Sequence, residues 1–497
     1  SLQMAIPKVV GTETEYGISA VGSPDFNPVL SSSLLISTFA GALRRIRWDY
    51  EQESPLRDAR GFEPVQVREP AEEDLGLANV ILPNGARYYV DHAHPEYSTP
   101  ECASPRELVV HDKAGERVLE RSLEEIHRVL PPGQRIAIYK NNSDGKGNSY
   151  GTHENYLVDR ATPFGAIVRD LTPFLVSRQV FTGAGKLGAE APWDDRDRHR
   201  FQLTQRADFF EAEVGLETTL KRPIINTRDE PHADPDKYRR LHVIIGDANM
   251  SEVATFLKVG TTALVLEMIE DEYLHDLSIA NPVSALHQIS RDITCTETVR
   301  LADDRRLTAV QIQWEYLERA RKYVEQEDDT PANRDILERW ERILTGLESE
   351  PLSLHRELDW VAKHRVLEGY RERDRLEWSD PKLRLVDLQY HDVRRDKGLY
   401  HRLVASGKVE RLTIDEEVER AVMEPPEDTR AYFRGRCIGK YPDAIAAASW
   451  DSMIFDTGRD ALQRIPMREP LRGTRQHVEQ VLDDAPDAAT LVSLLQS

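Results

Sequence analysis

Residues 84–99 read NGARYYVDHAHPEYST. Polar and apolar side chains alternate in its first half, which predicts a β-strand over residues 86–92. Arg87, Tyr89 and Asp91 then share one face of this strand, because successive side chains point to opposite faces.

Glu96 follows closely, so an arginine, a tyrosine and two carboxylates lie on one short stretch. Arginine pairs with phosphate oxygens, and carboxylates supply the hard oxygen ligands that Mg²⁺ prefers. The stretch therefore indicates a site for a nucleotide and Mg²⁺. A salt bridge at a strand edge is the alternative, but it would not require the two neighbouring histidines and the proline turn.

Residues 6–21 alternate in the same way and predict a second strand. Glu13 and Glu15 share one of its faces. Two adjacent carboxylates repel each other, and they are tolerated either in water or around a cation. Exposed glutamates are the simpler interpretation of this segment taken alone.

Two further strands carry polar pairs on one face: His153 with Asn155, and Arg240 with His242. Apolar residues occupy the opposite face of the last strand. Together the four segments predict one antiparallel sheet with an apolar face on helices and a polar face lined by Glu, Asp, His and Arg. The fold class expected is therefore α+β.

Composition limits the alternatives. The chain has 497 residues and a net charge of −21, which suggests two or more domains and disfavours a general nucleic-acid binder. No apolar run approaches the ~20 residues of a membrane span, so no membrane association is expected. The three cysteines lie far apart, which predicts a reducing, cytoplasmic setting.

The segment 49–74 holds nine acidic residues, three arginines and three prolines, and it predicts a long mobile loop extending over about 49–83. A second change of composition lies near residues 423–428. We place a domain boundary there, between a large unit, 1–427, and a small, mostly helical unit, 428–497.

Several motifs resemble the Pup ligase/depupylase family, which belongs to the carboxylate–amine ligases related to glutamine synthetase. The resemblance covers nearly the whole chain. It implies a glutamine synthetase-like large domain, with a curved antiparallel sheet backed by helices, and a small C-terminal domain. The motifs are GTETEYG, NGARYYVDHAHPEYSTPE, THENY, RPIINTRDEPHAD, RLHVIIGDANM and SWDSMIFD.

The family implies a partner, Pup, a small disordered protein that tags substrates for a bacterial proteasome. One branch ligates Pup to proteins. The other branch deamidates the C-terminal glutamine of Pup and hydrolyses the isopeptide bond between Pup and a substrate lysine. The long connection between Glu13 and Asp91 favours the deamidase branch, as does YFRGRCIGKY at 432–441. The ligase, a small-molecule ligase of the glutamate–cysteine type, and a non-catalytic Pup-binding module remain the alternatives.

The resemblance also implies roles for individual residues. The cofactors would be Mg²⁺ and ATP, or ADP with phosphate, and the catalytic residue would be Asp91. Glu13, Tyr89 and Glu96 match magnesium-site positions, with His153 and His242 as further metal or phosphate contacts. The nucleotide positions are Arg87, Thr99 and Trp450, and Glu15 is assigned to the cofactor site.

Pup is acidic, as this chain is, so its binding requires a local basic groove. The candidates for that groove lie among the basic residues between Arg196 and Arg240, and they include Arg206, Arg222, Arg228 and Arg240 itself. Each of these arginines could equally be an ordinary surface residue.

Overall fold

The computed structural model describes residues 5–40, 46–51, 53–61, 76–190 and 198–497. Its centre is a six-stranded antiparallel sheet. The strand order is β13 (Tyr238–Val243), β8 (Thr152–Asp159), β1 (Val10–Glu15), β6 (His94–Ser98), β5 (Arg87–Asp91) and β4 (Asn79–Ile81).

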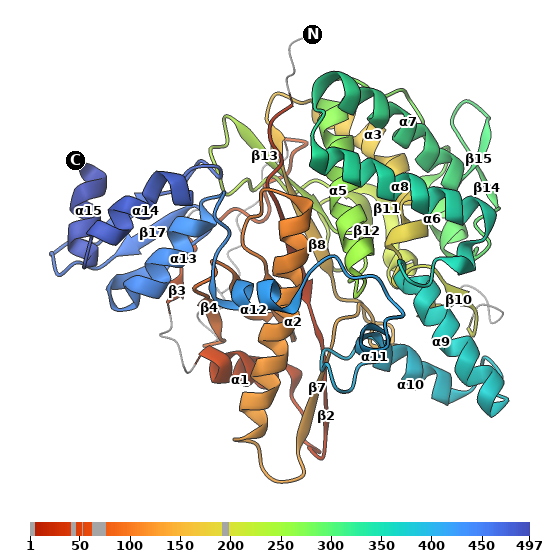
Figure 1. Cartoon of the computed structure of the whole chain (residues 1–497), viewed down its shortest axis with the longest axis horizontal. Helices are drawn as coiled ribbons and strands as arrows, with labels where there is room; N and C mark the ends of the chain where they lie inside the picture. Colours follow the sequence, from red (N-terminus) through yellow and green to blue (C-terminus); the bar gives the residue numbers. More distant parts are fainter. Residues whose placement is uncertain (1–4, 41–45, 52, 62–75, 191–197) are drawn as a thin grey trace.

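Helices form most of the remaining structure (Figure 1). They are α1 (Pro28–Ala40), α2 (Pro105–His127), α3 (Phe164–Ser177), α4 (Gln179–Thr182), α5 (Glu252–Glu270), α6 (Pro282–Ser290), α7 (Ala309–Glu327), α8 (Pro331–Ser349), α9 (Asp359–Asp374), α10 (Pro381–Tyr390), α11 (Leu399–Ala405), α12 (Asp415–Met423), α13 (Ala431–Lys440), α14 (Arg475–Asp484) and α15 (Ala488–Gln496).

The remaining strands form smaller sheets. They are β2 (Gly17–Val21), β3 (Arg47–Trp48), β7 (Arg135–Tyr139), β9 (Lys186–Leu187), β10 (Phe201–Gln202), β11 (Phe210–Gly215), β12 (Arg222–Asn226), β14 (Thr298–Arg300), β15 (Arg306–Thr308), β16 (Ile445–Ala448), β17 (Ser452–Phe455) and β18 (Gln463–Pro466).

One face of the central sheet is apolar and packs on helices, as the alternation predicts. Tyr156, Val158 and Leu241 join the core that contains α3 and α5. Tyr88 and Tyr97 join a second core with α1 and α2. The predicted α+β class is confirmed, and the opposite, polar face of the sheet is left for a site.

Helix α2 has a well-defined start. Ser104 is its N-cap and accepts a hydrogen bond from the backbone N–H of Glu107, and Pro105 occupies the first turn. Both features match the expected start of a helix, because an N-cap oxygen satisfies a free N–H and proline needs none there.

The single strand predicted for residues 6–21 is wrong. It breaks at Tyr16 into β1 and β2, which belong to different sheets. The backbone N–H of Tyr16 donates to the carbonyl of Pro95, while β2 turns away to pair with β7. The break directs Glu13 and Glu15 into the central sheet and removes the following residues from it.

Helix α1 ends at Ala40, residues 41–45 lie outside the described part of the chain, and Arg47–Trp48 is the strand β3. Strand β3 pairs in parallel with β16, which places it in the four-stranded sheet β18-β17-β16-β3.

The C-terminal elements form their own apolar cluster, to the left in Figure 1. Tyr432, Phe433, Met453 and Leu482 are buried in it, and Trp48 joins them from far upstream. The expectation of a mostly helical unit omitted this sheet, because its strands are only two to four residues long.

The acidic segment is not one continuous loop where it is described. Residues 79–81 form β4, and Asp58 makes a β-bridge to Arg228. Residues 62–75, which carry much of the predicted mobile loop, lie outside the described residues.

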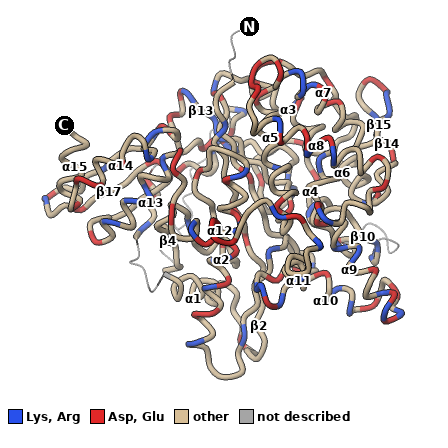
Figure 2. Tube along the Cα trace, viewed as in Figure 1, with Lys and Arg blue, Asp and Glu red and all other residues tan. Residues whose placement is uncertain are grey.

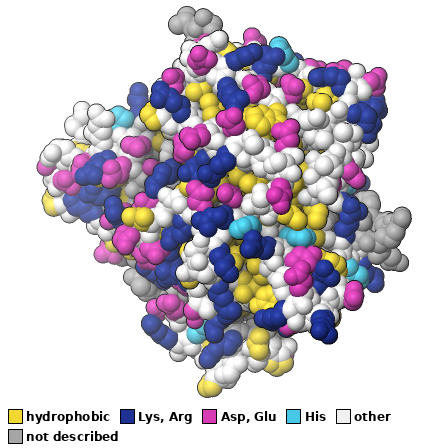
Figure 3. All heavy atoms as spheres, turned by 45° about the vertical axis from the view of Figure 1, so that its right-hand side comes forward, with side chains coloured by type: hydrophobic (Ala, Val, Ile, Leu, Met, Phe, Trp, Pro, Cys, Tyr) yellow, Lys and Arg dark blue, Asp and Glu magenta, His cyan; other side chains and the backbone are white. Residues whose placement is uncertain are grey.

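Acidic and basic residues are interspersed along the described part of the trace (Figure 2). On the face drawn in Figure 3 they are intermingled, so the negative net charge is not gathered into one patch there. Within the described part of the chain, none of the helices combines the length and apolar character needed to cross a membrane.

Candidate active site

The polar face of the central sheet lines a cavity of about 370 Å³. Most of the residues predicted from the sequence meet around it: Glu13, Glu15, Arg87, Tyr89, Asp91, Glu96, His153, Arg206, Arg228, Arg240 and Trp450. Thr99 lines a smaller, adjoining cavity of about 90 Å³ that also contacts Glu13, Arg240 and Trp450. His242 is buried at the edge of the group, 3.5 Å from the Glu13 carboxylate.

The strand register explains why these side chains converge. Glu15 on β1 is paired with Glu96 on β6, and Glu96 is paired with Tyr89 on β5. Asp91 ends β5 next to this row. Paired residues of neighbouring strands project to the same face, so the carboxylates gather at one end of the sheet.

Strand β6 was not predicted, because Pro95 lies within it and proline rarely occupies a central strand. Its carbonyl still accepts the N–H of Tyr16. The strand gives Glu96 the central place in the site. One of its carboxylate oxygens is buried and has no hydrogen-bond partner in the described part of the chain.

The crowding of carboxylates changes their acidity. Burial, followed by the charges of Asp91 and Glu15, raises the pKa of Glu96 well above its ordinary value. Burial and Asp91 raise the pKa of Glu15 to about 8. Burial also acts to raise the pKa of Asp91, but hydrogen bonds with His92, Glu96 and Glu15 hold it below its ordinary value. A cation would relieve this repulsion.

Asn155 organises the other end of the site. Its Nδ2 donates to Glu13 Oε2 over 2.9 Å, and its Oδ1 accepts from Arg240 Nη1 over 2.7 Å. The same Oδ1 lies 2.8 Å from His242 Nδ1. Because a carboxamide oxygen only accepts, His242 must donate from Nδ1.

This contact fixes the tautomer of His242. Burial, reinforced by Arg228, lowers the pKa of His242 well below its ordinary value, so the ring is neutral and its Nε2 carries a lone pair. Nε2 is buried and has no hydrogen-bond partner among the described residues. Burial likewise lowers the pKa of His153 to about 4, and its ring packs edge-on against His242 at 4.8 Å.

These donors fit a divalent cation. Atoms of Glu13, His153 and His242 lie within 4.8 Å of one another, as do atoms of Glu15, Asp91 and His92. The unpartnered oxygen of Glu96 and nitrogen of His242 add two free donors. Carboxylate oxygens suit Mg²⁺, whereas imidazole nitrogens also suit softer metals.

An aromatic corner closes the cavity next to Arg87. The guanidinium carbon lies 4.0 Å from the ring centre of Trp48 and 3.8 Å from that of Tyr89. Arg87 Nε donates to Asn79 Oδ1 over 3.0 Å. Trp450 packs edge-on against Trp48 at 5.4 Å, so the C-terminal elements contribute to the site.

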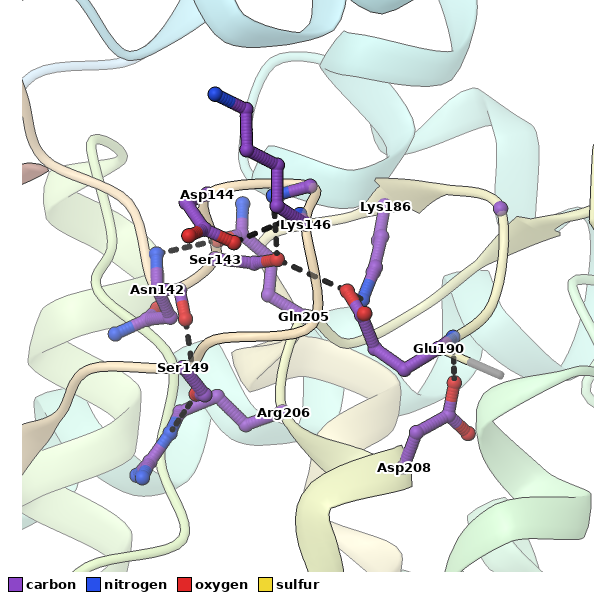
Figure 4. Close-up of polar contacts among 12 residues, drawn as sticks. Asn142, Ser143, Asp144, Lys146, Ser149, Lys186, Glu190, Gln205, Arg206 and Asp208 are labelled. Carbon is purple, nitrogen blue, oxygen red and sulfur yellow. Dashed lines mark hydrogen bonds and ion pairs between the residues drawn. The ribbon is translucent and has the colours of Figure 1, made fainter. Parts of the chain in front are cut away.

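Basic residues form another part of the cavity wall. Arg206 is almost fully buried and its Nε donates to Ser149 Oγ over 3.3 Å (Figure 4). Arg222 donates to the carbonyl of Ser149 over 3.3 Å. Within the described residues neither arginine has a carboxylate partner, and burial together with Arg222 lowers the pKa of Arg206 to about 9. Such a wall favours an anion.

A polar loop supports this wall. The backbone N–H of Asn142 donates to Gln205 Oε1 over 2.6 Å, which ties residues 142–149 to the neighbour of Arg206. Ser143 Oγ donates to Glu190 over 3.0 Å, as Figure 4 shows. Hydrogen bonds between three chain segments, around residues 142–149, 190 and 205–206, therefore stabilise this wall.

Comparison with known proteins agrees with this arrangement. The family model described as Pup-ligase protein matches residues 8–454. This chain belongs to the Pup-ligase family.

Within the Pup-ligase family, several relatives match nearly the whole chain. A depupylase of Acidothermus cellulolyticus is 60% identical, covering 98% of this chain and 99% of its own length. A Pup deamidase/depupylase of Mycobacterium tuberculosis is 54% identical over 98% and 99%. A Pup–protein ligase of Actinosynnema mirum is 44% identical over 82% and 90%.

Two solved structures of the family share the fold. The complex between Pup and its ligase PafA has a TM-score of 0.81 and 33% identity, covering 97% of this chain and 94% of that one. PafA in complex with ADP has a TM-score of 0.75 and 35% identity, covering 88% and 99%.

Some site residues were not singled out from the sequence. Trp48 reaches Arg87 from a segment far upstream, and no sequence pattern signals that contact. Glu230 and His232 line the cavity, 3.2 Å apart, and both lie in the quoted motif RPIINTRDEPHAD. That motif was the available signal for them.

Proposed function

We propose that this protein is a nucleotide-dependent amidohydrolase. It deamidates the C-terminal glutamine of Pup to glutamate and hydrolyses the isopeptide bond between Pup and substrate lysines. The observation that carries the proposal is the near-complete match to proteins named depupylase and Pup deamidase/depupylase, at 60% and 54% identity. The geometry supports it, because one cavity holds a carboxylate cluster and a basic wall.

Both reactions are the same chemistry at one carbon. Water is added across a side-chain amide, and the products are a carboxylate and either ammonia or the lysine amine. The reaction needs a nucleophile or base, a group that stabilises the oxyanion, and a proton for the leaving nitrogen. One site can therefore serve both substrates.

Asp91 is the proposed catalytic residue. Its carboxylate lies at the end of β5, faces the cavity and is partly accessible. As a nucleophile it attacks the amide carbon and expels the amine, and water then cleaves the resulting anhydride. As a base it takes a proton from the attacking water. A carboxylate with a lowered pKa is a weak base, which favours the first route.

We propose that Glu13, Glu15 and Glu96 hold Mg²⁺, with Tyr89, His153 and His242 beside them. The unpartnered atoms of Glu96 and His242 support this assignment. A bound Mg²⁺ would supply positive charge for phosphate oxygens and for a developing oxyanion.

We propose that the nucleotide, ATP or ADP with phosphate, occupies the adjoining cavities next to Arg87, Thr99 and Trp450. The ADP complex of the related ligase PafA supports a nucleotide here. Residues 428–497 act as a small domain that contributes Trp450 to this part of the site. The large domain, residues 1–427, contributes β3.

Pup is the proposed macromolecular partner, and Arg206, Arg228 and Arg240 are proposed to contact its acidic C-terminal end. The PafA complex with Pup supports this partner. The basic wall, with two arginines that have no carboxylate partner among the described residues, supports an acidic ligand. The three unpaired, buried cysteines fit a reducing cytoplasmic compartment that also holds a bacterial proteasome.

One experiment tests the proposal against its alternatives. The protein is incubated with glutamine-ended Pup, and separately with a Pup–protein conjugate, each with ATP, with ADP and phosphate, and without nucleotide. Ammonia or free substrate protein, released only with nucleotide, is the expected result. New conjugates formed from glutamate-ended Pup and ATP would instead identify a ligase. Pup binding without turnover would identify a binding module.

A further inference from the structure

Arg434 on α13 is completely buried and joins three segments of the chain. It pairs with the carboxylate of Glu101, and its Nη2 donates to the carbonyl of Gly85 over 2.8 Å. Its Nη1 donates to the carbonyl of Trp450 over 3.2 Å, and its guanidinium carbon lies 5.0 Å from the Trp450 ring centre.

Each of these contacts lies next to a proposed nucleotide residue. Gly85 precedes Arg87 by two positions, and Glu101 follows Thr99 by two. The third contact is Trp450 itself. One side chain therefore links the three parts of the chain that line the nucleotide cavities.

Arg430, one helical turn earlier, completes the junction. Its Nε donates to Glu101 over 2.5 Å, and its Nη1 donates to the carbonyl of His232 over 2.6 Å. Although burial acts to raise the pKa of Glu101, the charges of Arg434 and Arg430 hold it at about 2. Glu101 is therefore ionised at neutral pH and both arginines are fixed on it.

Two glycines allow this close approach. A Cβ on Gly435 would lie 2.4 Å from the carbonyl of Pro83, and Gly85 has a φ of +85° with Ala431 directly above it. Helix α13 therefore rests on the β4–β5 turn backbone to backbone. Because the two backbones are in close contact, a shift of Arg434 on α13 would also shift β5, the strand that carries Arg87.

We propose that Arg434 is a positioning residue for the nucleotide. Held on Glu101, it sets the distance between the Trp450 ring and the edge of the central sheet. It contacts no reacting atom, and its effect on binding passes through Trp450. This inference rests on the proposed nucleotide site and adds a requirement on the C-terminal helix.

The test is a double-mutant cycle on the full chain, with ADP binding measured by calorimetry in the presence of Mg²⁺. The variants are Arg434→Lys, Trp450→Ala and the two combined. Each single variant is expected to weaken ADP binding about tenfold, and the double variant to be no more than about twofold weaker than Trp450→Ala, since coupled residues are not additive. At saturating nucleotide, kcat of Arg434→Lys stays near that of the unaltered protein while KM for nucleotide rises.

Arg436→Lys on the same helix is the matched control, because Arg436 is partly exposed and pairs with Asp483 on α14. It is expected to leave ADP binding unchanged. Glu101→Gln removes the same ion pair from the other side and provides a second variant for the cycle. Additive losses, or a fall in kcat with unchanged ADP affinity, would overturn the positioning role alone. Failure of the unaltered protein to bind ADP would overturn the nucleotide site as well.

Discussion

Asn155 Nδ2 donates to Glu13 Oε2 over 2.9 Å, and Asn155 Oδ1 lies 2.8 Å from His242 Nδ1, so this one amide bridges Glu13 on β1 and His242 on β13. Through its Oδ1 the same amide holds His242 in the tautomer that leaves Nε2 free. Asn155 is thus placed to orient two proposed ligands at once without contacting the cation.

We expect Asn155→Leu to raise the Mg²⁺ concentration needed for half-maximal turnover by about 10–100-fold, because loss of an orienting partner typically costs that much in metal affinity. The measurement is a Mg²⁺ titration at fixed nucleotide and Pup. Asn148→Leu, at an exposed position in the loop beside Asp144, is the control and should not differ from the unaltered protein. An unchanged Mg²⁺ dependence in Asn155→Leu would rule out the orienting role.

Asp91→Asn is expected to abolish both deamidation and isopeptide cleavage while leaving ADP affinity within about twofold, because in the proposed mechanism Asp91 acts on the amide carbon, whereas Arg87, Thr99 and Trp450 hold the nucleotide. Activity is followed by ammonia release and by gel analysis of a Pup conjugate, and ADP affinity by calorimetry. Asp25→Asn, exposed near the end of β2, is the comparison. Residual turnover above about 1% would show that another group carries the reaction.

The polar face of the central sheet was predictable, because polar and apolar residues alternate along four of its segments. Glu13, Asp91, His153 and His242 each occupy the expected face, and strand pairing then brings them together without further information. The alternation is a local signal, so it survives in the sequence regardless of which strands become neighbours.

The parts that could not be predicted depend on contacts distant in sequence. Pro95 conceals β6, because proline argues against a central strand. The contact between Arg87 and Trp48 joins two segments across the acidic connection, and the two-residue strand β3 is too short to leave a pattern. The Arg434–Glu101 pair joins residues more than three hundred positions apart. Secondary-structure propensity is a local property, so it cannot predict such long-range pairs.

Arg228→Gln and Arg206→Gln are each expected to raise KM for Pup about tenfold, because each removes a cation from the wall that we propose contacts the acidic end of Pup. The rise is measured at saturating nucleotide, and added salt should weaken the difference at the more exposed Arg228. Lys221→Gln, exposed at the start of the same segment, is the matched control. If KM for Pup is unchanged in both arginine variants, Pup does not bind along this wall.

Glu101 makes stability depend on pH in a specific window. Its folded pKa of about 2 lies below the ordinary value of 4.5, so the ion pairs stabilise the fold fully above pH 4.5 and lose this effect as the pH falls toward 2. The contribution is about 3 kcal/mol at neutral pH, from 1.36 kcal/mol per pKa unit. Urea unfolding of Glu101→Gln should therefore show a loss at pH 7 that shrinks at pH 3.5.

Glu424→Gln, exposed beyond α12, is the control for that measurement and should follow the unaltered protein at both values. A destabilisation by Glu101→Gln that is equal at pH 7 and pH 3.5 would mean that hydrogen bonding, and not the charge of Glu101, holds α13 in place.

The start of the acidic connection is docked on the segment that carries Arg228. Asp58 Oδ2 accepts from Thr227 Oγ1 over 2.9 Å, and the N–H of Ala59 donates to the carbonyl of Thr227 over 2.7 Å. Asp58→Ala breaks the first contact, worth about 1 kcal/mol for a typical hydrogen bond. We expect turnover of the Pup conjugate to fall roughly fivefold, since 1.4 kcal/mol is a factor of ten, with little change in thermal stability.

Asp58→Asn keeps an acceptor for Thr227 and should fall between Asp58→Ala and the unaltered protein, which separates the hydrogen bond from the charge. The assay is initial-rate cleavage at saturating nucleotide, with melting temperatures recorded for each variant. Identical rates in all three proteins would show that the acidic connection does not influence the Arg228 wall. A rate that falls only together with the melting temperature would assign Asp58 to folding, because a positioning contact at the site should affect turnover before it affects global stability.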